Sequence, residues 1–156
     1  MNHFVYAMPL GRLTIAANDR GITRIAFGDV PLESPRRPSA LTNTAATQLQ
    51  EYFAGKRRAF DVPIDLQGSP FQLEVWNRLS AIPYGETRTY AQVAEEIGRP
   101  RAFRAVGMAN NKNPIPIIVP CHRVIGAGGK LVGYAAGIKL KRYLLEHEGI
   151  DPTSLH

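Results

Sequence analysis

Cys121 is the residue of this chain best suited to covalent chemistry. It is the only cysteine among 156 residues, it ends the apolar, proline-rich run 114–120, and His122 and Arg123 follow it. A thiol becomes a useful nucleophile when an imidazole or a cation lowers its pKa. The pattern therefore indicates a reactive cysteine, and the alternative is a buried, unreactive apolar side chain. Neighbouring residues of an extended strand point to opposite faces, so contact between Cys121 and His122 requires a turn at Pro120.

Glu148 is the candidate third member of this group. It lies in the last turn of a helix expected over residues 137–148, where the helix dipole disfavours a carboxylate by roughly 0.3–1 kcal/mol. A partner such as His122 would offset that cost, whereas a solvated helix end would need no partner. A cysteine, a histidine and a carboxylate also occur together in hydrolases, so these residue types do not by themselves choose the reaction.

Positive charge is concentrated in one part of the chain. Lys and Arg number 19 against 13 Asp and Glu, which gives a formal net charge of +6. Protein surfaces usually intersperse both signs, so an unmixed basic run predicts a partner with a phosphate backbone, and a solvated basic surface is the alternative. Residues 97–142 contain no acidic residue and nine basic ones: Arg99, Arg101, Arg104, Lys112, Arg123, Lys130, Lys139, Lys141 and Arg142.

The cysteine count and the apolar runs suggest where the protein works. One cysteine excludes an internal disulfide framework and fits a reducing compartment. No apolar run approaches the ~20 residues of a membrane span, and the first residues lack the pattern of a secretory signal. We therefore expect a cytoplasmic protein.

The first 67 residues predict a small domain with an antiparallel sheet and a helix. Alternating apolar residues and turn signals indicate strands over 4–8, 13–17 and 22–27, and a further alternation indicates a strand over 60–66. Three prolines make residues 30–39 a loop, and a helix is expected over 44–54. The domain boundary is expected at residues 67–69.

Residues 68–156 predict a mostly helical domain. Ser69 and Gln72 form a helix start signal for a helix over 70–81. Helices over 90–97 and 100–110, joined by a glycine turn, suggest a helix-turn-helix, which presents one helix face to DNA. On the second helix Arg101, Arg104 and Met108 share the exposed face. The run 114–120 is expected to be a buried extended segment that carries Cys121 into the interior.

Four blocks of this domain resemble one family. They are PYGETRTYAQVA over 83–94, RAFRAVG over 101–107, NPIPIIVPCHRV over 113–124 and GYAAGIKLKRYLLEHEG over 133–149. The third contains PCHRV, the hallmark of the O6-alkylguanine-DNA alkyltransferase (methylated-DNA–protein-cysteine methyltransferase) family. The resemblance covers residues 69–149 strongly and is weaker at PLGRLTIAA near the N-terminus. It implies an α/β (α+β) fold, with a small N-terminal domain of antiparallel sheet and helix and a C-terminal winged-helix or helix-turn-helix domain that carries the active cysteine.

The resemblance also implies a reaction, the direct reversal of DNA alkylation. Cys121 takes the alkyl group from O6 of guanine, and possibly O4 of thymine, and is consumed. His122, through a water, accepts the thiol proton, and Glu148 orients His122. Asn113 matches an asparagine that braces the active-site turn, and Tyr134 matches a tyrosine that helps protonate the departing guanine.

DNA contacts follow from the same resemblance. Arg104 is expected to enter the base stack as the damaged nucleotide leaves, and Tyr90 to press on the adjacent phosphate. Arg101, Met108 and Arg123 are further expected contacts, from the helix face and the basic run. The family binds double-stranded DNA through the minor groove, and a monomer is expected.

Two departures and two alternatives accompany this interpretation. With one cysteine the chain cannot copy the zinc site of some relatives, so no metal and no cofactor are expected. Val132 stands where some relatives carry glycine, which bears on the size of alkyl group accepted. A non-catalytic protein that binds alkyl lesions in DNA and, less favoured, a cysteine hydrolase remain as alternatives.

Overall fold

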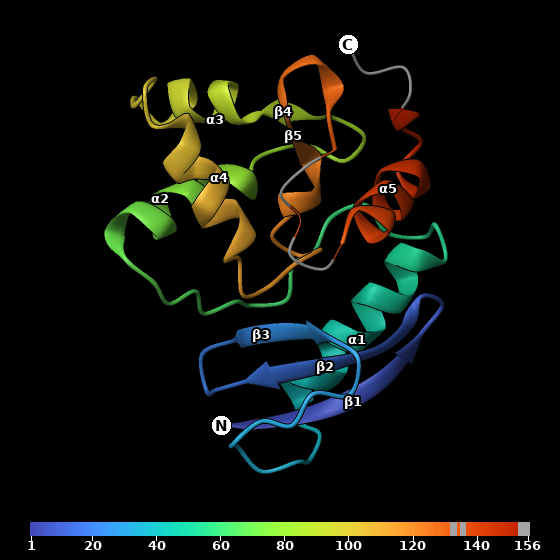
Figure 1. The fold of residues 1–156 in the computed structure, drawn as a ribbon. Coiled ribbons are helices and arrows are strands. Elements are labelled where there is room, and N and C mark those ends of the chain that lie inside the picture. Colours follow the sequence, from blue (N-terminus) through green and yellow to red (C-terminus); the bar gives the residue numbers. More distant parts are fainter. Residues whose placement is uncertain (132–133, 135–136, 153–156) are drawn as a thin grey trace. The chain divides into compact units, whose positions relative to one another are not determined.

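Three antiparallel strands begin the chain, β1 (Asn2–Met8), β2 (Gly11–Ala17) and β3 (Ile22–Phe27), in the order β1-β2-β3. The computed structural model describes residues 1–131, 134 and 137–152 and divides the chain into two compact units, Met1–Gln67 and Gly68–His156 (Figure 1). β2 is the central strand, and its Leu13 and Ile15 are fully buried. The three predicted N-terminal strands are confirmed to within two residues at each end.

Helix α1 (Ala40–Phe53) packs on this sheet and buries Leu49 and Tyr52 completely. It begins four residues earlier than predicted because Ser39 is its N-cap. The Ser39 hydroxyl accepts from the backbone N–H of Thr42, and the Thr42 hydroxyl accepts from that of Ser39. Together the two bonds satisfy two N–H groups that the helix start leaves unpaired.

The predicted strand over 60–66 is wrong. Only one isolated bridge forms there, between Ile64 and Ile22. Pro63 has no N–H to donate to a strand ladder. The side chain of Gln48 instead accepts from the backbone N–H groups of Asp61 and Val62, at 3.2 Å each. The segment is therefore held by a helix side chain and a short bridge.

The second unit is mostly helical. Its elements are α2 (Pro70–Leu79), β4 (Arg88–Thr89), α3 (Tyr90–Glu96), α4 (Phe103–Asn111), a 3-10 turn η1 (Cys121–Arg123), β5 (Val124–Ile125), a second 3-10 turn η2 (Ala127–Gly129) and α5 (Ile138–His147). Strands β4 and β5 pair in parallel. An antiparallel sheet with a helix followed by a helical C-terminal region confirms the predicted fold class.

Helices α3 and α4 form the predicted helix-turn-helix. Gly98 follows α3 with φ +77°, a left-handed conformation that glycine adopts without strain. Helix α4 begins at Phe103, later than predicted from Pro100. The residues between form a separate turn in which the N–H of Ala102 donates to the Arg99 carbonyl at 2.9 Å.

The buried interior of the second unit fixes the C-terminal end of α4. Trp76 of α2 is 2% exposed, and its indole N–H donates to the carbonyl of Ala109 at 2.9 Å. Leu144 and Leu145 of α5 are also fully buried.

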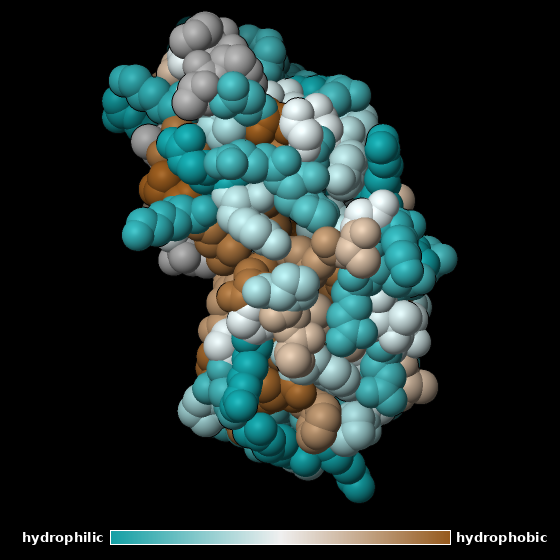
Figure 2. Space-filling model, turned by 90° about the vertical axis from the view of Figure 1, so that its right-hand side faces the viewer, coloured by the Kyte–Doolittle hydropathy of each residue, from teal (hydrophilic) through white to brown (hydrophobic). Residues whose placement is uncertain are grey.

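On the outer surface, Figure 2 shows a face where hydrophilic residues cover much of the area, with smaller hydrophobic areas among them. In the described part of the chain no helix has the length and apolar character needed to cross a membrane.

Candidate active site

A compact turn leads into Cys121. The N–H of Val119 donates to the Ile115 carbonyl at 2.9 Å, and Ile117 has φ +74°. The extended conformation predicted for residues 114–120 is therefore wrong, because the chain folds back on itself, whereas the predicted burial is confirmed by Ile115, Ile117 and Val119. A positive φ is uncommon for a β-branched residue such as isoleucine and is kept only when the surroundings determine it.

Asn113 braces this turn at both ends. Its Nδ2 donates to the carbonyl of Val119 at 2.7 Å, and its Oδ1 accepts from the N–H of Ile115 at 3.0 Å. One side chain thus closes the loop whose backbone would otherwise leave these groups unpaired. Asn113 was singled out from the sequence, and its geometry fits the bracing role expected there.

Cys121 begins the 3-10 turn η1 and is 4% exposed. Its N–H donates to the Val119 carbonyl at 2.8 Å. Its carbonyl accepts from the N–H of Val124 and from Nδ2 of Asn110 at 3.3 Å. The main chain of the candidate nucleophile is therefore fixed on both sides.

Asn110 is a site residue that the sequence analysis missed. It is 1% exposed, and its Oδ1 is buried with no hydrogen-bond partner among the described residues. The sequence offered one signal of this burial: Asn110 lies on the same side of α4 as the apolar residues Val106 and Ala109. A buried amide on an apolar helix face needs a reason, because an unpaired buried acceptor costs about 1–3 kcal/mol.

His122 and Glu148 meet inside the second unit. His122 is fully buried, and its Nε2 lies 2.7 Å from Oε2 of Glu148. A carboxylate only accepts, so Nε2 carries the proton and Nδ1 is left as the basic nitrogen. Nδ1 is buried and has no hydrogen-bond partner in the described part of the chain. Burial lowers the pKa of His122 despite the opposing effect of Glu148, which favours a neutral imidazole.

Glu148 is held by more than the histidine. Its Oε1 accepts from Nε of Arg123 at 2.8 Å and from the N–H of Gly85 at 3.2 Å, and its Oε2 accepts from Nη2 of Arg123 at 3.0 Å. Burial alone would raise the pKa of Glu148, but the hydrogen bonds and charges of His122 and Arg123 outweigh it and hold that pKa well below its usual range. These partners offset the unfavourable position at the end of α5.

The predicted DNA contact by Arg123 is wrong. The residue is 5% exposed, and its Nη1 donates to the carbonyl of Ile82 at 2.7 Å, in addition to the two bonds with Glu148. A guanidinium that is buried and engaged through all three of its nitrogens is not available to a phosphate. Its function in this structure is to hold Glu148.

Lys141 is a second buried cation that the sequence analysis counted only as part of the basic run. It is fully buried on α5, and its Nζ donates to the carbonyl of Val124. The ring centroids of Tyr90 and Tyr134 each lie 5.8 Å from Nζ. Burial lowers the pKa of Lys141 to about 8, against a raising effect of the Cys121 charge. The sequence offered one signal of this burial: Lys141 lies three residues before Leu144 and so shares the apolar face of α5.

Opposing influences act on the Cys121 thiol. Burial raises the pKa of Cys121, whereas the nearby polar side chains of Asn113 and Tyr134 and the charge of Lys141 lower it. Burial and the Cys121 charge raise the pKa of Tyr90 to about 12, so its hydroxyl keeps its proton. Tyr134, which was expected to help protonate the departing guanine, is 9% exposed. Val132, which was expected to bear on the size of the alkyl group accepted, lies outside the described residues.

The residues expected to face DNA have different surroundings. Arg101 and Arg104 are exposed, Met108 is 63% exposed, and Arg104 lies over the ring of Phe103 with 5.9 Å to the ring centroid. These side chains come from α4 and the turn before it, opposite the buried Val106. Tyr90 at the start of α3 is half-buried instead.

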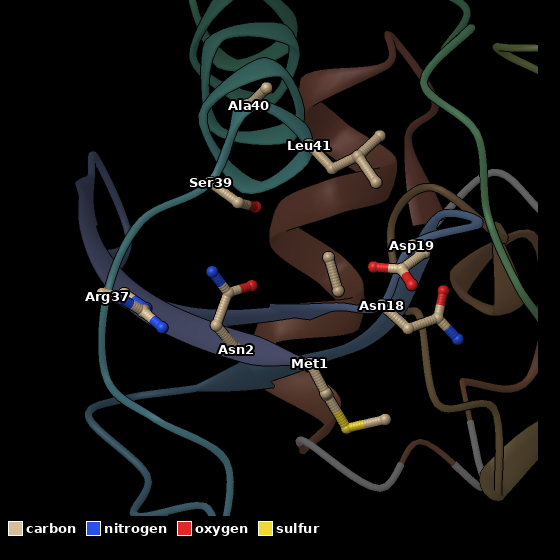
Figure 3. Close-up of a pocket in the computed structure, with 9 residues that line it drawn as sticks. Met1, Asn2, Asn18, Asp19, Arg37, Ser39, Ala40 and Leu41 are labelled. Carbon is tan, nitrogen blue, oxygen red and sulfur yellow. The ribbon is translucent and has the colours of Figure 1, made fainter.

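The first unit has a pocket of its own, shown in Figure 3. Polar groups of Asn2, Asn18, Asp19, Arg37 and Ser39 line it, together with apolar atoms of Met1, Ala17, Ala40 and Leu41. None of the predicted site residues lines this pocket, and the candidate active site around Cys121 belongs to the second unit.

Comparisons with known proteins agree with this division of the chain. Residues 70–150 match the DNA-binding domain of 6-O-methylguanine DNA methyltransferase, and residues 1–66 match the ribonuclease-like domain of the same protein family. The chain therefore belongs to the 6-O-methylguanine DNA methyltransferase family.

Relatives match over nearly the whole length. A methylated-DNA–protein-cysteine methyltransferase of Methanosarcina acetivorans is 47% identical over 154 residues, which cover 96% of this chain and 99% of the relative. A methylated-DNA–protein-cysteine methyltransferase of Mycobacterium tuberculosis is 51% identical over 145 residues, which cover 90% of this chain and 87% of the relative. A crystal structure of Mycobacterium tuberculosis OGT in complex with DNA matches with a TM-score of 0.89 and 45% identity, covering 99% of each chain.

Proposed function

We propose that this protein is a methylated-DNA–protein-cysteine methyltransferase that repairs O6-alkylguanine in DNA by moving the alkyl group to Sγ of Cys121. The observation that carries the proposal is the joining of His122 to Glu148 at 2.7 Å within the same buried cluster as Cys121. Relatives about half identical over most of the chain carry the same activity in their names.

The chemistry follows from the protonation states of the site. Nδ1 of the neutral His122 takes the thiol proton through a water, and Glu148 stabilises the imidazolium that forms. The thiolate sulfur attacks the alkyl carbon, the S–C bond forms, and the bond from carbon to O6 breaks with its electron pair on guanine. The guanine takes up a proton with the help of Tyr134. The product is a thioether with no carbonyl for water to attack, so each chain acts once.

Contact with DNA is assigned to the exposed side of α4. Arg104 is proposed to fill the space left by the damaged nucleotide, with Arg101, Met108 and Tyr90 against the surrounding DNA. We propose that α4 enters the minor groove, where the code is degenerate, because a repair protein must act in any sequence. A cytoplasmic monomer is the proposed working form, with no metal and no cofactor.

Transfer of a labelled methyl group tests the proposal. Duplex DNA with O6-[³H]methylguanine is added in increasing amounts, and the label bound to protein is expected to reach a plateau at one methyl per chain. Cys121→Ala is the control and is expected to bind the DNA without taking up label. Binding without label in the parent protein would favour the non-catalytic lesion-binding alternative, and continued turnover would contradict a single-use acceptor.

A further inference from the structure

Helix α4 carries an exposed aromatic side chain that the proposed mechanism does not use. Phe103, the first residue of the helix, is 44% exposed. Five large apolar side chains are exposed among the residues that the structure describes, and two of them, Phe103 and Met108, belong to this nine-residue helix. One exposed apolar side chain is ordinary, but two on a short helix favour a surface that a partner covers.

Helical periodicity places Phe103 on the side of α4 that leads to Cys121. Gly107 and Asn110 follow it by four and seven residues, so the three residues share one face of the helix. A Cβ atom added to Gly107 would lie 3.7 Å from the ring of Tyr90. The amide of Asn110 donates to the Cys121 carbonyl at 3.3 Å. Phe103 therefore lies at the exposed end of the helix face that borders the active site.

The charges around Phe103 identify the kind of partner. Arg101 and Arg104 flank it, both are exposed, and neither has an ion-pair partner in the described part of the chain. The Arg104 guanidinium lies over the Phe103 ring, with 5.9 Å to the ring centroid. Arg99, by contrast, is paired with Glu74 at 3.4 Å. A flat apolar ring between two unpaired cations suits a nucleic acid, which offers phosphates to the cations and the face of a base to the ring.

We propose that Phe103 packs against the displaced O6-alkylguanine nucleotide as it enters the active site. The inference rests on the proposed function, in which Arg104 fills the space that this nucleotide leaves. Arg104 lies about 100° further round α4. A nucleotide that leaves the stack beside Arg104 and reaches Cys121 therefore passes the edge of the helix that carries Phe103. Because the ring meets the nucleotide only outside the stack, it stabilises the extruded state and not the paired one.

Single-turnover methyl transfer at saturating protein tests this contact. Phe103→Ala should slow transfer from duplex DNA about tenfold, the size of one base–aromatic contact, without changing the affinity for undamaged DNA. Phe103→Tyr keeps the ring and should match the parent. Tyr143→Ala removes an exposed aromatic side chain of α5 and should also match the parent. Urea unfolding followed through Trp76 establishes that each variant is folded.

A second pair of variants separates contact with DNA from support of Arg104. If the Phe103 ring acts only by holding the Arg104 guanidinium, Phe103→Ala will have no effect in an Arg104→Ala background, and that result would overturn the inference. We expect most of the slowing to remain there, because the ring meets the nucleotide itself. A loss of affinity for undamaged DNA as large as the loss of rate would make Phe103 a general DNA contact and would also overturn it. So would binding to anionic phospholipid vesicles that is lost in Phe103→Ala while transfer is unchanged.

Binding without transfer keeps this inference separate from the proposed function. In a Cys121→Ala background, fluorescence anisotropy measures the preference for DNA with O6-methylguanine over undamaged DNA. We expect this preference to shrink when Phe103→Ala is added. If the parent takes up no methyl yet the preference depends on Phe103, the proposed transfer fails and the contact stands. If Phe103→Ala takes up methyl at the parent's rate, the proposed function stands and the contact fails.

Discussion

Replacing Glu148 with glutamine is expected to destabilise the second unit far more than a surface change would. The carboxylate accepts hydrogen bonds from Gly85 and His122 and two from Arg123. Glu148→Gln keeps the size of the side chain and removes its charge, which leaves the Arg123 guanidinium buried beside a neutral amide. Removing one partner of a buried ion pair costs about 3–5 kcal/mol, or between about two and four powers of ten in the ratio of folded to unfolded protein.

Urea unfolding followed by fluorescence measures this loss. Trp76 is the single tryptophan, it is buried in the second unit, and it therefore reports on the unit that contains Glu148. Glu146→Gln is the matched control because Glu146 is exposed two residues away on the same helix. A loss below about 1 kcal/mol for Glu148→Gln, the range of an exposed pair, would refute the reasoning. The double variant Glu148→Leu with Arg123→Met should recover much of the loss, since it leaves neither charge unpaired.

The same pair predicts how stability depends on pH. The pKa of Glu148 is lower in the folded than in the unfolded protein, so its contribution is fully present above the unfolded value. That contribution is lost as the pH falls from the unfolded pKa toward the folded one. The difference in unfolding free energy between the parent and Glu148→Gln should therefore shrink in acid. A difference that stays constant across the acid range would mean that the carboxylate is not preferentially ionised in the folded state.

Three further predictions concern α4 and the basic run. Arg104→Ala should slow methyl transfer from paired DNA and matter less where the lesion lies in a mismatch, because flipping a weakly paired base costs less; equal defects in single-turnover rates on both substrates would make Arg104 only a phosphate contact. DNA affinity, measured by fluorescence anisotropy, should fall with salt at a log–log slope of about −0.9 per phosphate neutralised, or roughly −3 to −5 in total, and a flat curve would mean that the basic run is only solvated surface. Asn110→Leu should leave thermal stability unchanged or raise it, because an unpaired buried acceptor disappears, while transfer slows as the Cys121 carbonyl loses a donor. Lower stability together with normal transfer would assign Asn110 a purely structural role.

Local signals in the sequence were sufficient for many elements of the fold. Ser69 and Gln72 predict the start of α2, because a capping box is formed by two residues that lie three apart in the sequence. The strands of the first sheet follow from alternation, which is also local. Alternation failed at residues 60–66, where Pro63 and the distant Gln48 decide how the backbone is satisfied. Predictions mostly held where neighbours in sequence determine the structure, and the start of α1, set by Ser39 and Thr42, is an exception.

The site was predictable in its residue types and less so in its environment. Asn113, His122 and Glu148 were singled out from the sequence, and the structure places each in a defined hydrogen-bond arrangement. Arg123 and Lys141 were counted in the basic run that predicts a phosphate-backbone partner, although residues of these types can be buried when they are paired. Their burial depends on partners remote in sequence, such as Glu148 for Arg123. The left-handed backbone of Ile117 likewise has no signal in its residue type.

The most direct test of the central claim locates the transferred group on the protein. The chain is incubated with an excess of duplex DNA that contains O6-methylguanine, digested, and analysed by mass spectrometry of the peptide that contains Cys121. We expect one methyl group on the sulfur of Cys121 in every chain and an equal amount of restored guanine in the DNA. Restored guanine with an unmodified Cys121, or a methyl group on any other residue, would contradict the account.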